Sequence, residues 1–158
     1  MERERVKDME ADQLSGYEKM VRHYQSWSDR MKTGKLLIRG DERDYQVSRQ
    51  GFLKYYLNPL DTDTAISSWA VFEQLIKRQS GRHKHQGGVI IYVLEGEGYT
   101  ETNGEVLEWQ SGDLLLLPIQ PGGCNHQHWN KDESKGCRWV AFRDLLVARY
   151  IANAIDQV

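Results

Sequence analysis

Residues 81–98 read GRHKHQGGVIIYVLEGEG, and they place two histidines one residue apart just before a run of strand-forming residues. In an extended strand, side chains two positions apart point to the same face of the sheet. His83 and His85 therefore converge on one point if this stretch is a strand. Such a pair is either a polar turn or part of a metal site.

A second pair has the same spacing. Residues 112–130 read GDLLLLPIQPGGCNHQHWN and contain His126 and His128. The same parity puts Cys124 on that face, although a free cysteine is usually a small buried hydrophobe, and we expect that here. Four of the five histidines of the chain thus occur in two such pairs, each beside a predicted strand.

These two pairs indicate a metal site. Neutral imidazole is a good ligand for iron, nickel, copper and zinc, and three protein ligands leave positions open for substrate or oxygen. A lone histidine is more often a satisfied polar side chain. Two pairs at strand spacing favour ligands that rigid backbone delivers to one metal ion.

Composition limits the class of protein. A chain of 158 residues with 39% hydrophobic residues suffices for one ordinary core. Its formal net charge of -2 predicts no basic face, so we expect no nucleic-acid partner. The charged N-terminus lacks a signal peptide's apolar region and no segment is long enough to span a bilayer, so we expect a cytoplasmic protein with no membrane partner. Its two cysteines, Cys124 and Cys137, are expected to be reduced thiols.

Apolar residues at helical spacing predict two terminal helices. The stripe over residues 14–31 belongs to a helix that packs on this domain or on a partner subunit, with a membrane-surface or regulatory helix as the alternative. The second stripe predicts a closing helix within residues 144–158. Short apolar segments broken by turns between the helices predict a small β-barrel or sandwich.

The clearest strand signals lie in the second half of the chain. Asn103 and Gly104 tolerate positive φ and separate two strand-like segments, which predicts a tight hairpin. The run at residues 113–118 is expected to be a buried strand. Further strands are expected within residues 35–42, 51–63, 67–81 and 137–142.

The two histidine-containing stretches together resemble the two sequence motifs of the cupins. The resemblance implies an all-β core, the cupin double-stranded β-helix or jelly-roll barrel, at residues 36–143. An N-terminal helical extension at residues 1–35 would precede the barrel, and a C-terminal helix at residues 144–158 would pack on it.

The resemblance also implies the ligands. It makes His83, His85 and His126 the metal ligands, while Val89 and Ile90 stand where many cupins have a carboxylate ligand. His128 would be a fourth ligand, a hydrogen-bond donor to a ligand, or an acid/base group beside the substrate.

A first motif without glutamate, with His-x-His before asparagine in the second, is similar to the three-His cupins of the gentisate dioxygenase type. The resemblance implies a mononuclear non-haem iron dioxygenase that acts on a small aromatic or enolisable oxygenated compound. Its partners would be that substrate, O2 and a second copy of the chain in a homodimer. Zinc, nickel or manganese are alternative metals, and His128 would carry a proton during the reaction.

Two other functions stay open. The same ligands would suit a metal-dependent lyase or isomerase that uses the metal as a Lewis acid, and a barrel could also bind a small molecule without catalysis. Gln74, Arg78 and Arg143 are polar residues in otherwise apolar strands, and one of them could orient a substrate carboxylate.

Overall fold

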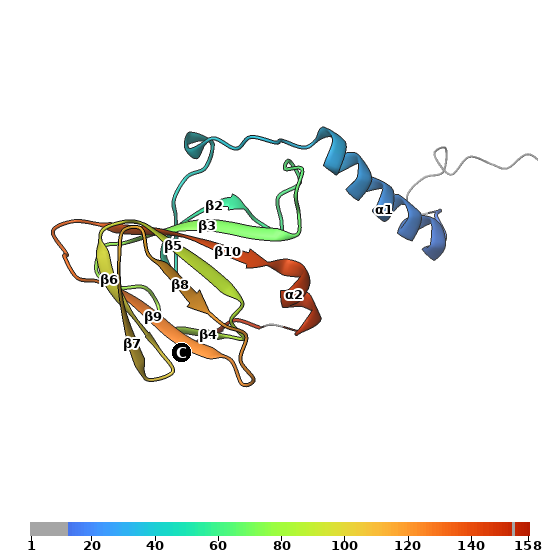
Figure 1. The fold of residues 1–158 in the computed structure, drawn as a ribbon. Coiled ribbons are helices and arrows are strands. Elements are labelled where there is room, and N and C mark those ends of the chain that lie inside the picture. The colour runs from blue at the N-terminus through green and yellow to red at the C-terminus, as the bar shows by residue number, and fades with distance from the viewer. Residues whose placement is uncertain (1–12, 153) are drawn as a thin grey trace, which may run out of the picture. The chain divides into compact units, whose positions relative to one another are not determined.

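A computed structural model describes residues 13–152 and 154–158 of the chain (Figure 1). Its contacts divide the chain into two units. One unit comprises the chain up to Leu36 together with Thr62–Ile66. The other comprises Leu37–Asp61 and Ser67–Val158, and it contains the strands described below.

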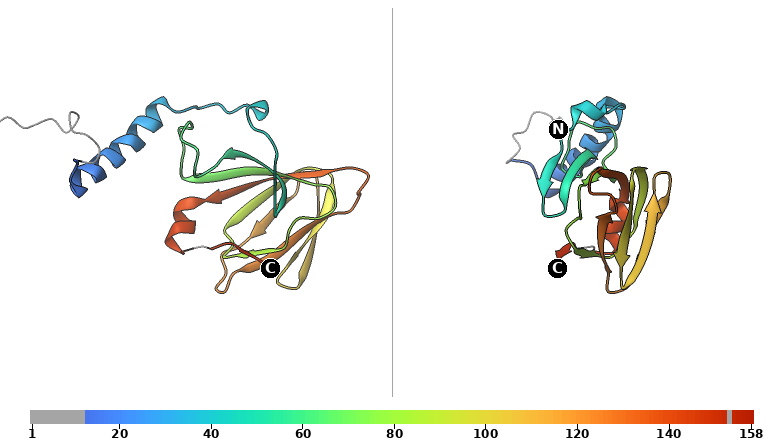
Figure 2. Two further views of the ribbon diagram at one scale, coloured as in Figure 1. Left: turned by 180° about the vertical axis from the view of Figure 1, so that it is seen from behind. Right: turned by 90° about the vertical axis from the view of Figure 1, so that its left-hand side faces the viewer.

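The strands form two antiparallel sheets, seen as two layers in Figure 2. In sheet order, the six-stranded sheet consists of β1 (Gln46–Ser48), β2 (Gly51–Leu57), β3 (Trp69–Ile76), β10 (Cys137–Asp144), β5 (Val89–Glu95) and β8 (Leu114–Leu117). The five-stranded sheet consists of β11 (Asp156–Gln157), β4 (His83–His85), β9 (Cys124–Asn130), β6 (Glu97–Thr102) and β7 (Glu105–Gln110). The predicted all-β core is confirmed.

The core lies between the two sheets. Along β5, Val89, Ile91 and Val93 are buried, while the residues between them are exposed. This alternation is the period of a strand with one face on the core. Trp109 on β7 and Cys124 on β9 join the same apolar cluster from the other sheet.

The tight hairpin predicted at Asn103 and Gly104 is confirmed. Both residues have positive φ, 50° and 89°, and Thr102 pairs with Glu105 across the turn. The left-handed conformation at both central positions matches the twist of the flanking strands. The hairpin joins β6 to β7 at the end of the five-stranded sheet.

The run at residues 113–118 forms β8, but only half of it is buried. Leu115 and Leu117 face the core, whereas Leu114 and Leu116 are 58% and 57% exposed. The expectation of a fully buried strand is wrong because β8 is an edge strand and its sheet has an open outer face. An unbroken apolar run does not distinguish a strand covered on both faces from one covered on a single face.

The strand expected within residues 35–42 is not formed. Lys35 forms an isolated β-bridge to Thr64 that does not extend into a strand, and Gly40–Glu42 forms a short 3-10 helix, η2. Leu36 and Leu37 are exposed, so no burial of apolar surface holds this segment in a sheet.

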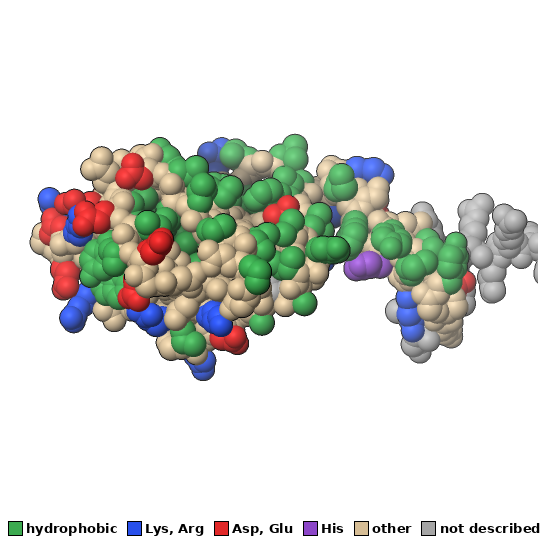
Figure 3. Space-filling view, turned by 60° about the horizontal axis from the view of Figure 1, so that its bottom comes forward, with side chains coloured by type: hydrophobic (Ala, Val, Ile, Leu, Met, Phe, Trp, Pro, Cys, Tyr) green, Lys and Arg blue, Asp and Glu red, His purple; other side chains and the backbone are tan. Residues whose placement is uncertain are grey.

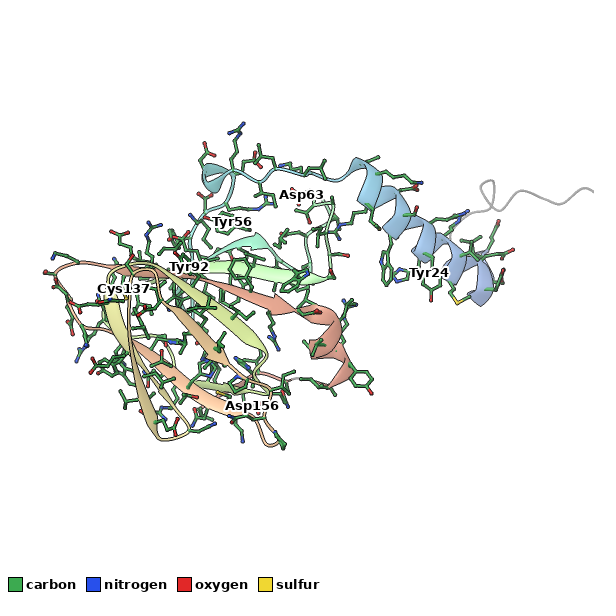
Figure 4. All side chains as sticks on the ribbon, viewed as in Figure 1. Tyr24, Tyr56, Asp63, Tyr92, Cys137 and Asp156 are labelled. Atoms are coloured by element: carbon green, nitrogen blue, oxygen red, sulfur yellow. The ribbon has the colours of Figure 1, made fainter. Side chains whose placement is uncertain are left out.

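The closing helix is present but shorter than expected. It is α2, Leu145–Tyr150, and the Asp144 carboxylate caps it by accepting from two backbone N–H groups. Ala152 has a φ of 48°, which ends the helical path. The chain then forms β11, whose Asp156, labelled in Figure 4, pairs with Lys84 of β4. Only Leu145 of α2 is buried, so a longer helix would have gained little apolar burial.

A buried carboxylate ties β2, β3 and β10 together. Glu73 is 2% exposed and accepts hydrogen bonds from Tyr45, from Tyr56 at 2.9 Å (labelled in Figure 4) and from Arg138 at 2.8 Å. Lys54 Nζ lies 3.3 Å from the same carboxylate. Burial alone would raise the pKa of Glu73, but these donors outweigh it and lower the pKa to about 2.

The first unit is built on α1, Gly16–Thr33, and residues 1–12 of the expected extension lie outside the described residues. Ser15 and Glu18 form a capping box at its start. At its end, Arg30 donates to the backbone oxygen and the hydroxyl of Thr64.

No described helix is long and apolar enough to cross a bilayer. Figure 3 shows hydrophobic side chains along α1, and these exposed residues are Tyr17, Met20, Tyr24, Trp27 and Met31.

Candidate metal centre

Strand pairing brings three histidines together. β4 and β9 are antiparallel neighbours in which His83 pairs with His126 and His85 with Cys124. The ring centroid of His126 lies 4.1 Å from that of His83 and 4.7 Å from that of His85. One ring nitrogen of each of the three lies within 4.8 Å of the others. The parity of the two pairs thus produces one cluster on the inner face of the sheet.

Hydrogen bonds fix the protons of two of these rings. His83 Nδ1 lies 3.3 Å from the carbonyl oxygen of Gly81, and His126 Nδ1 lies 3.1 Å from that of Cys124. A carbonyl oxygen only accepts, so each Nδ1 carries the proton and donates it. Nε2 of both rings therefore keeps a lone pair that a metal ion can use.

The third ring is held differently. The backbone N–H of Gly87 donates to His85 Nδ1 at 2.9 Å, so the proton of this neutral ring is on Nε2. Binding a metal through Nε2 requires release of this hydrogen bond and transfer of the proton to Nδ1. Binding through Nδ1 requires only the release of the hydrogen bond from Gly87. Of the three histidines, His85 is therefore the one whose hydrogen bonding would have to change if a metal ion bound.

All three rings are neutral at neutral pH. Burial is the main cause, and it lowers the pKa of His126 to about 2, that of His85 to about 4 and that of His83 below its usual range. The charge of Arg143 acts in the same direction on His83 and His85. Neutral imidazole is the form that binds metals, and the three-His cluster fits a divalent metal ion.

The fourth paired histidine belongs to a separate hydrogen-bond chain. The indole N–H of Trp109 donates to Thr100 Oγ1 at 2.9 Å, and Thr100 Oγ1 lies 2.7 Å from His128 Nδ1. Thr100 is 0% exposed and its oxygen already accepts from Trp109, so His128 Nδ1 is the acceptor that the described residues offer to its hydroxyl proton. His128 then carries its own proton on Nε2. This arrangement favours a hydrogen-bond donor over a fourth metal ligand.

The histidines open onto a cavity of about 410 Å³ between the sheets. Apolar residues form most of its wall, including an aromatic row in which Phe72 lies 5.2 Å from Tyr55 and 6.0 Å from Trp139 between ring centroids. The Trp139 ring lies 5.1 Å from that of His128. Val89 lines the cavity where many cupins would place a carboxylate, and no described Asp or Glu side chain lines it.

Comparison with known proteins agrees with this geometry. Residues 72–143 match the family model described as a cupin domain. This segment is a cupin domain. It runs from β3 to β10 and contains all four paired histidines.

The relatives of this cupin domain include proteins named as dioxygenases. A gentisate 1,2-dioxygenase from a Haloferax species is 29% identical over 94 residues, which is 59% of this chain and 25% of that protein. The chain thus spans about a quarter of the length of this curated relative.

Solved structures share the fold. The salicylate 1,2-dioxygenase of Pseudaminobacter salicylatoxidans superposes with a TM-score of 0.54 at 23% identity, over 85% of this chain and 37% of that one. A polyketide cyclase from Streptomyces resistomycificus superposes with a TM-score of 0.57 at 17% identity, over 70% of this chain and 80% of that one.

The polar strand residues singled out in the sequence separate in the cupin fold. Gln74 lines the cavity, but its side-chain amide donates to the backbone oxygen of Gln50. Arg78 is exposed and lies 3.4 Å from Glu133. Arg143 lines the cavity and shares the inward parity of β10 with buried residues. Of the three, only Arg143 offers a charged group to the cavity.

Sequence reasoning did not find the partners of His128. Thr100 and Trp109 lie on β6 and β7, in segments that predicted only a hairpin. Their parity in β6 and β7 would have marked both as inward-facing, because Thr100 pairs with His128 and Gly98 with Trp109 across the ladders. The strand parity of Thr100 and Trp109 is therefore the sequence signal that could have identified them as neighbours of His128.

Proposed function

We propose that this cupin chain is a mononuclear non-haem iron dioxygenase acting on a small aromatic or enolisable oxygenated compound. The observation that carries the proposal is the cluster of His83, His85 and His126, which has no acidic neighbour in the described cavity wall and opens onto an apolar cavity. The gentisate dioxygenase relative supports the same reaction class. Neutral ligands leave the metal its full positive charge, which favours an anionic chelating substrate.

In this proposal the chain's own residues have distinct roles. His83, His85 and His126 would hold ferrous iron, which when bound would pass electrons from the substrate to O2. The apolar wall excludes water from the reacting atoms. His128 keeps its proton at Nε2 and donates a hydrogen bond from it to an oxygen of the substrate as negative charge develops there.

Oxygen uptake tests the proposal. Metal-free protein is reconstituted anaerobically with Fe(II), Mn(II), Ni(II) or Zn(II) and assayed with an oxygen electrode against catechols, hydroxybenzoates and diketones. We expect the Fe(II) form to consume one O2 per substrate converted and the Zn(II) form to consume none. A fully iron-loaded sample that converts a substrate without consuming O2 would replace the dioxygenase with a lyase or isomerase. Binding of these compounds without conversion would leave a small-molecule-binding cupin.

We further propose that the chain forms a homodimer through the outer face of the six-stranded sheet. Apolar side chains on this face are exposed, and they are Ile90, Tyr92, Leu94, Leu114, Leu116 and Phe142. A contiguous apolar surface of this kind is typical of a subunit interface. Light scattering after size exclusion should give a dimer for the wild type and a monomer for Leu116→Lys, and a wild-type monomer at micromolar concentration would contradict the proposal.

A further inference from the structure

Arg143 is the one charged side chain among the residues described in the cavity wall, the neutral histidines aside. The side chain of Arg143 forms no hydrogen bond or ion pair within the described part of the chain, and its Nε is buried without a partner. Arg138, five residues earlier on the same strand but on the opposite face, donates to Glu73 at 2.8 Å and to Glu95 at 2.9 Å. A structural arginine in this sheet is thus paired with acids, and Arg143 is not.

Two further cavity-lining side chains have a buried polar atom without a hydrogen-bond partner. They are the indole Nε1 of Trp139, which is a donor, and Oε1 of Gln50, which is an acceptor. Buried polar groups are nearly always paired in folded proteins, and leaving one unpaired is costly. Three such atoms around one cavity indicate a ligand that completes them.

We propose that Arg143 binds the carboxylate of a small aromatic acid inside the cavity, with the ring of the acid against the aromatic row of Tyr55, Phe72 and Trp139. The guanidinium fork matches a carboxylate with two parallel hydrogen bonds, and one cation matches one anion. The rest of the wall is mostly apolar and holds no other charged side chain among the described residues, which suits a ring and disfavours a highly charged ligand such as a phosphate ester. This subsite deepens the proposed function, on which it rests for identifying the acid as a substrate.

Arg143 and the histidines reach the cavity from opposite sheets. Arg143 lies on β10 of the six-stranded sheet, opposite Val89 of β5 in the ladder, whereas the histidine cluster lies on β4 and β9 of the other sheet. A ligand held at both ends therefore has its carboxylate toward one sheet and its oxygens toward the metal site on the other. Arg143 is in this way a specificity-determining residue for the class of acid accepted.

Benzoate binding to the metal-free protein is the direct test. A change in the intrinsic tryptophan fluorescence reports binding, because Trp139 lines the cavity, and benzamide is the neutral probe of the same shape. We expect Arg143→Gln to weaken benzoate binding about 10- to 100-fold and to leave benzamide binding unchanged, because it removes a charge-assisted pair. Arg78→Gln removes an arginine outside the cavity and should have no effect. Unchanged benzoate affinity in Arg143→Gln overturns the proposal, as does a wild type that does not distinguish benzoate from benzamide.

Thermal unfolding gives a second readout that separates a ligand subsite from a structural role. Without ligand, Arg143→Gln should melt at or above the wild-type temperature, since it removes an unpaired buried charge. Benzoate should raise the melting temperature of the wild type and not that of the variant. A variant that unfolds at a lower temperature and still gains the full benzoate shift would overturn the proposal. Arg143→Lys keeps the positive charge but loses the paired N–H donors of the guanidinium, so it should bind benzoate with an intermediate affinity.

The two proposals fail separately. If benzoate binds through Arg143 and the iron-loaded protein consumes no O2 with any acid, the dioxygenase is wrong and the subsite stands. If iron-loaded Arg143→Gln consumes O2 with a hydroxybenzoate at the wild-type KM, the subsite is wrong and the dioxygenase stands.

Discussion

Replacing Thr100 with valine should destabilise the protein and release the ring of His128. Valine has nearly the shape of threonine, so the main change is loss of the hydroxyl. That hydroxyl accepts from Trp109 Nε1 at 2.9 Å and donates to His128 Nδ1 at 2.7 Å. All three residues are at least 95% buried, so no water replaces the lost partner.

The size of the effect follows from the two groups that lose their partner. A buried donor or acceptor left unsatisfied costs about 1–3 kcal/mol. Trp109 and His128 share one partner, so the two costs do not add in full. We therefore expect Thr100→Val to lower the free energy of unfolding by about 3 kcal/mol.

Urea denaturation measures this difference, and Thr102→Val is the matched control on the same strand. Among the described residues, the hydrogen-bond partner of the Thr102 hydroxyl is the sulfur of Cys124, at 3.0 Å, which is a weak partner. The control should lose less than about 1 kcal/mol. Imidazole ¹⁵N shifts provide the second measurement, because His128 should be protonated at Nε2 in the wild type and as a mixture of tautomers in Thr100→Val.

Two results would refute this reasoning. The first is a Thr100→Val protein as stable as the wild type, which would mean that the hydroxyl does not satisfy the two buried rings. The second is a wild-type His128 protonated at Nδ1, which would reverse the hydrogen bond from Thr100 and leave Nε2 able to bind a metal.

Three other changes test separate parts of the structure. Glu73→Gln should remove about 3 kcal/mol of stability at pH 7, because the folded pKa of about 2 lies below the ordinary value near 4.5. In the wild type this contribution is complete above about pH 4.5 and is lost as the pH falls toward 2; a difference in stability between wild type and variant that is the same at pH 7 and pH 2 would contradict it. Gly87→Ala should cost more than the control Gly112→Ala in urea unfolding: both have positive φ, but only at Gly87 would a Cβ lie 1.9 Å from the Pro118 oxygen. Finally, His128→Gln should keep full iron content and lose at least about 100-fold in kcat, and an unchanged kcat would exclude its role as a hydrogen-bond donor to the substrate.

The metal cluster was predictable because it follows from local parity. His83 and His85, like His126 and His128, need only a strand to share a face, and the strands on either side have clear apolar runs. The Asn103–Gly104 hairpin was predictable for a similar reason, since its backbone conformation is a property of two adjacent residues.

The remaining features depend on contacts between distant segments. Leu114 and Leu116 are exposed because the outer face of the six-stranded sheet is open, which the sequence of β8 does not specify. The last residues form β11 because the edge of β4 is open to pair with them. The inward direction of the Arg143 side chain could have been inferred from Cys137, Trp139 and Ala141, which alternate toward the core along β10. That no acidic side chain lies beside it in the described cavity wall could be seen only from the folded structure.

Metal content is the most direct test of the central claim that three histidines hold the metal. Wild type and single alanine variants are loaded anaerobically with Fe(II), freed of excess metal and measured by elemental analysis, with His23→Ala on the exposed face of α1 as the control. We predict one iron per chain for the wild type, His23→Ala and His128→Ala, and almost none for His83→Ala, His85→Ala and His126→Ala. Full iron content in any of the last three would remove that histidine from the metal site.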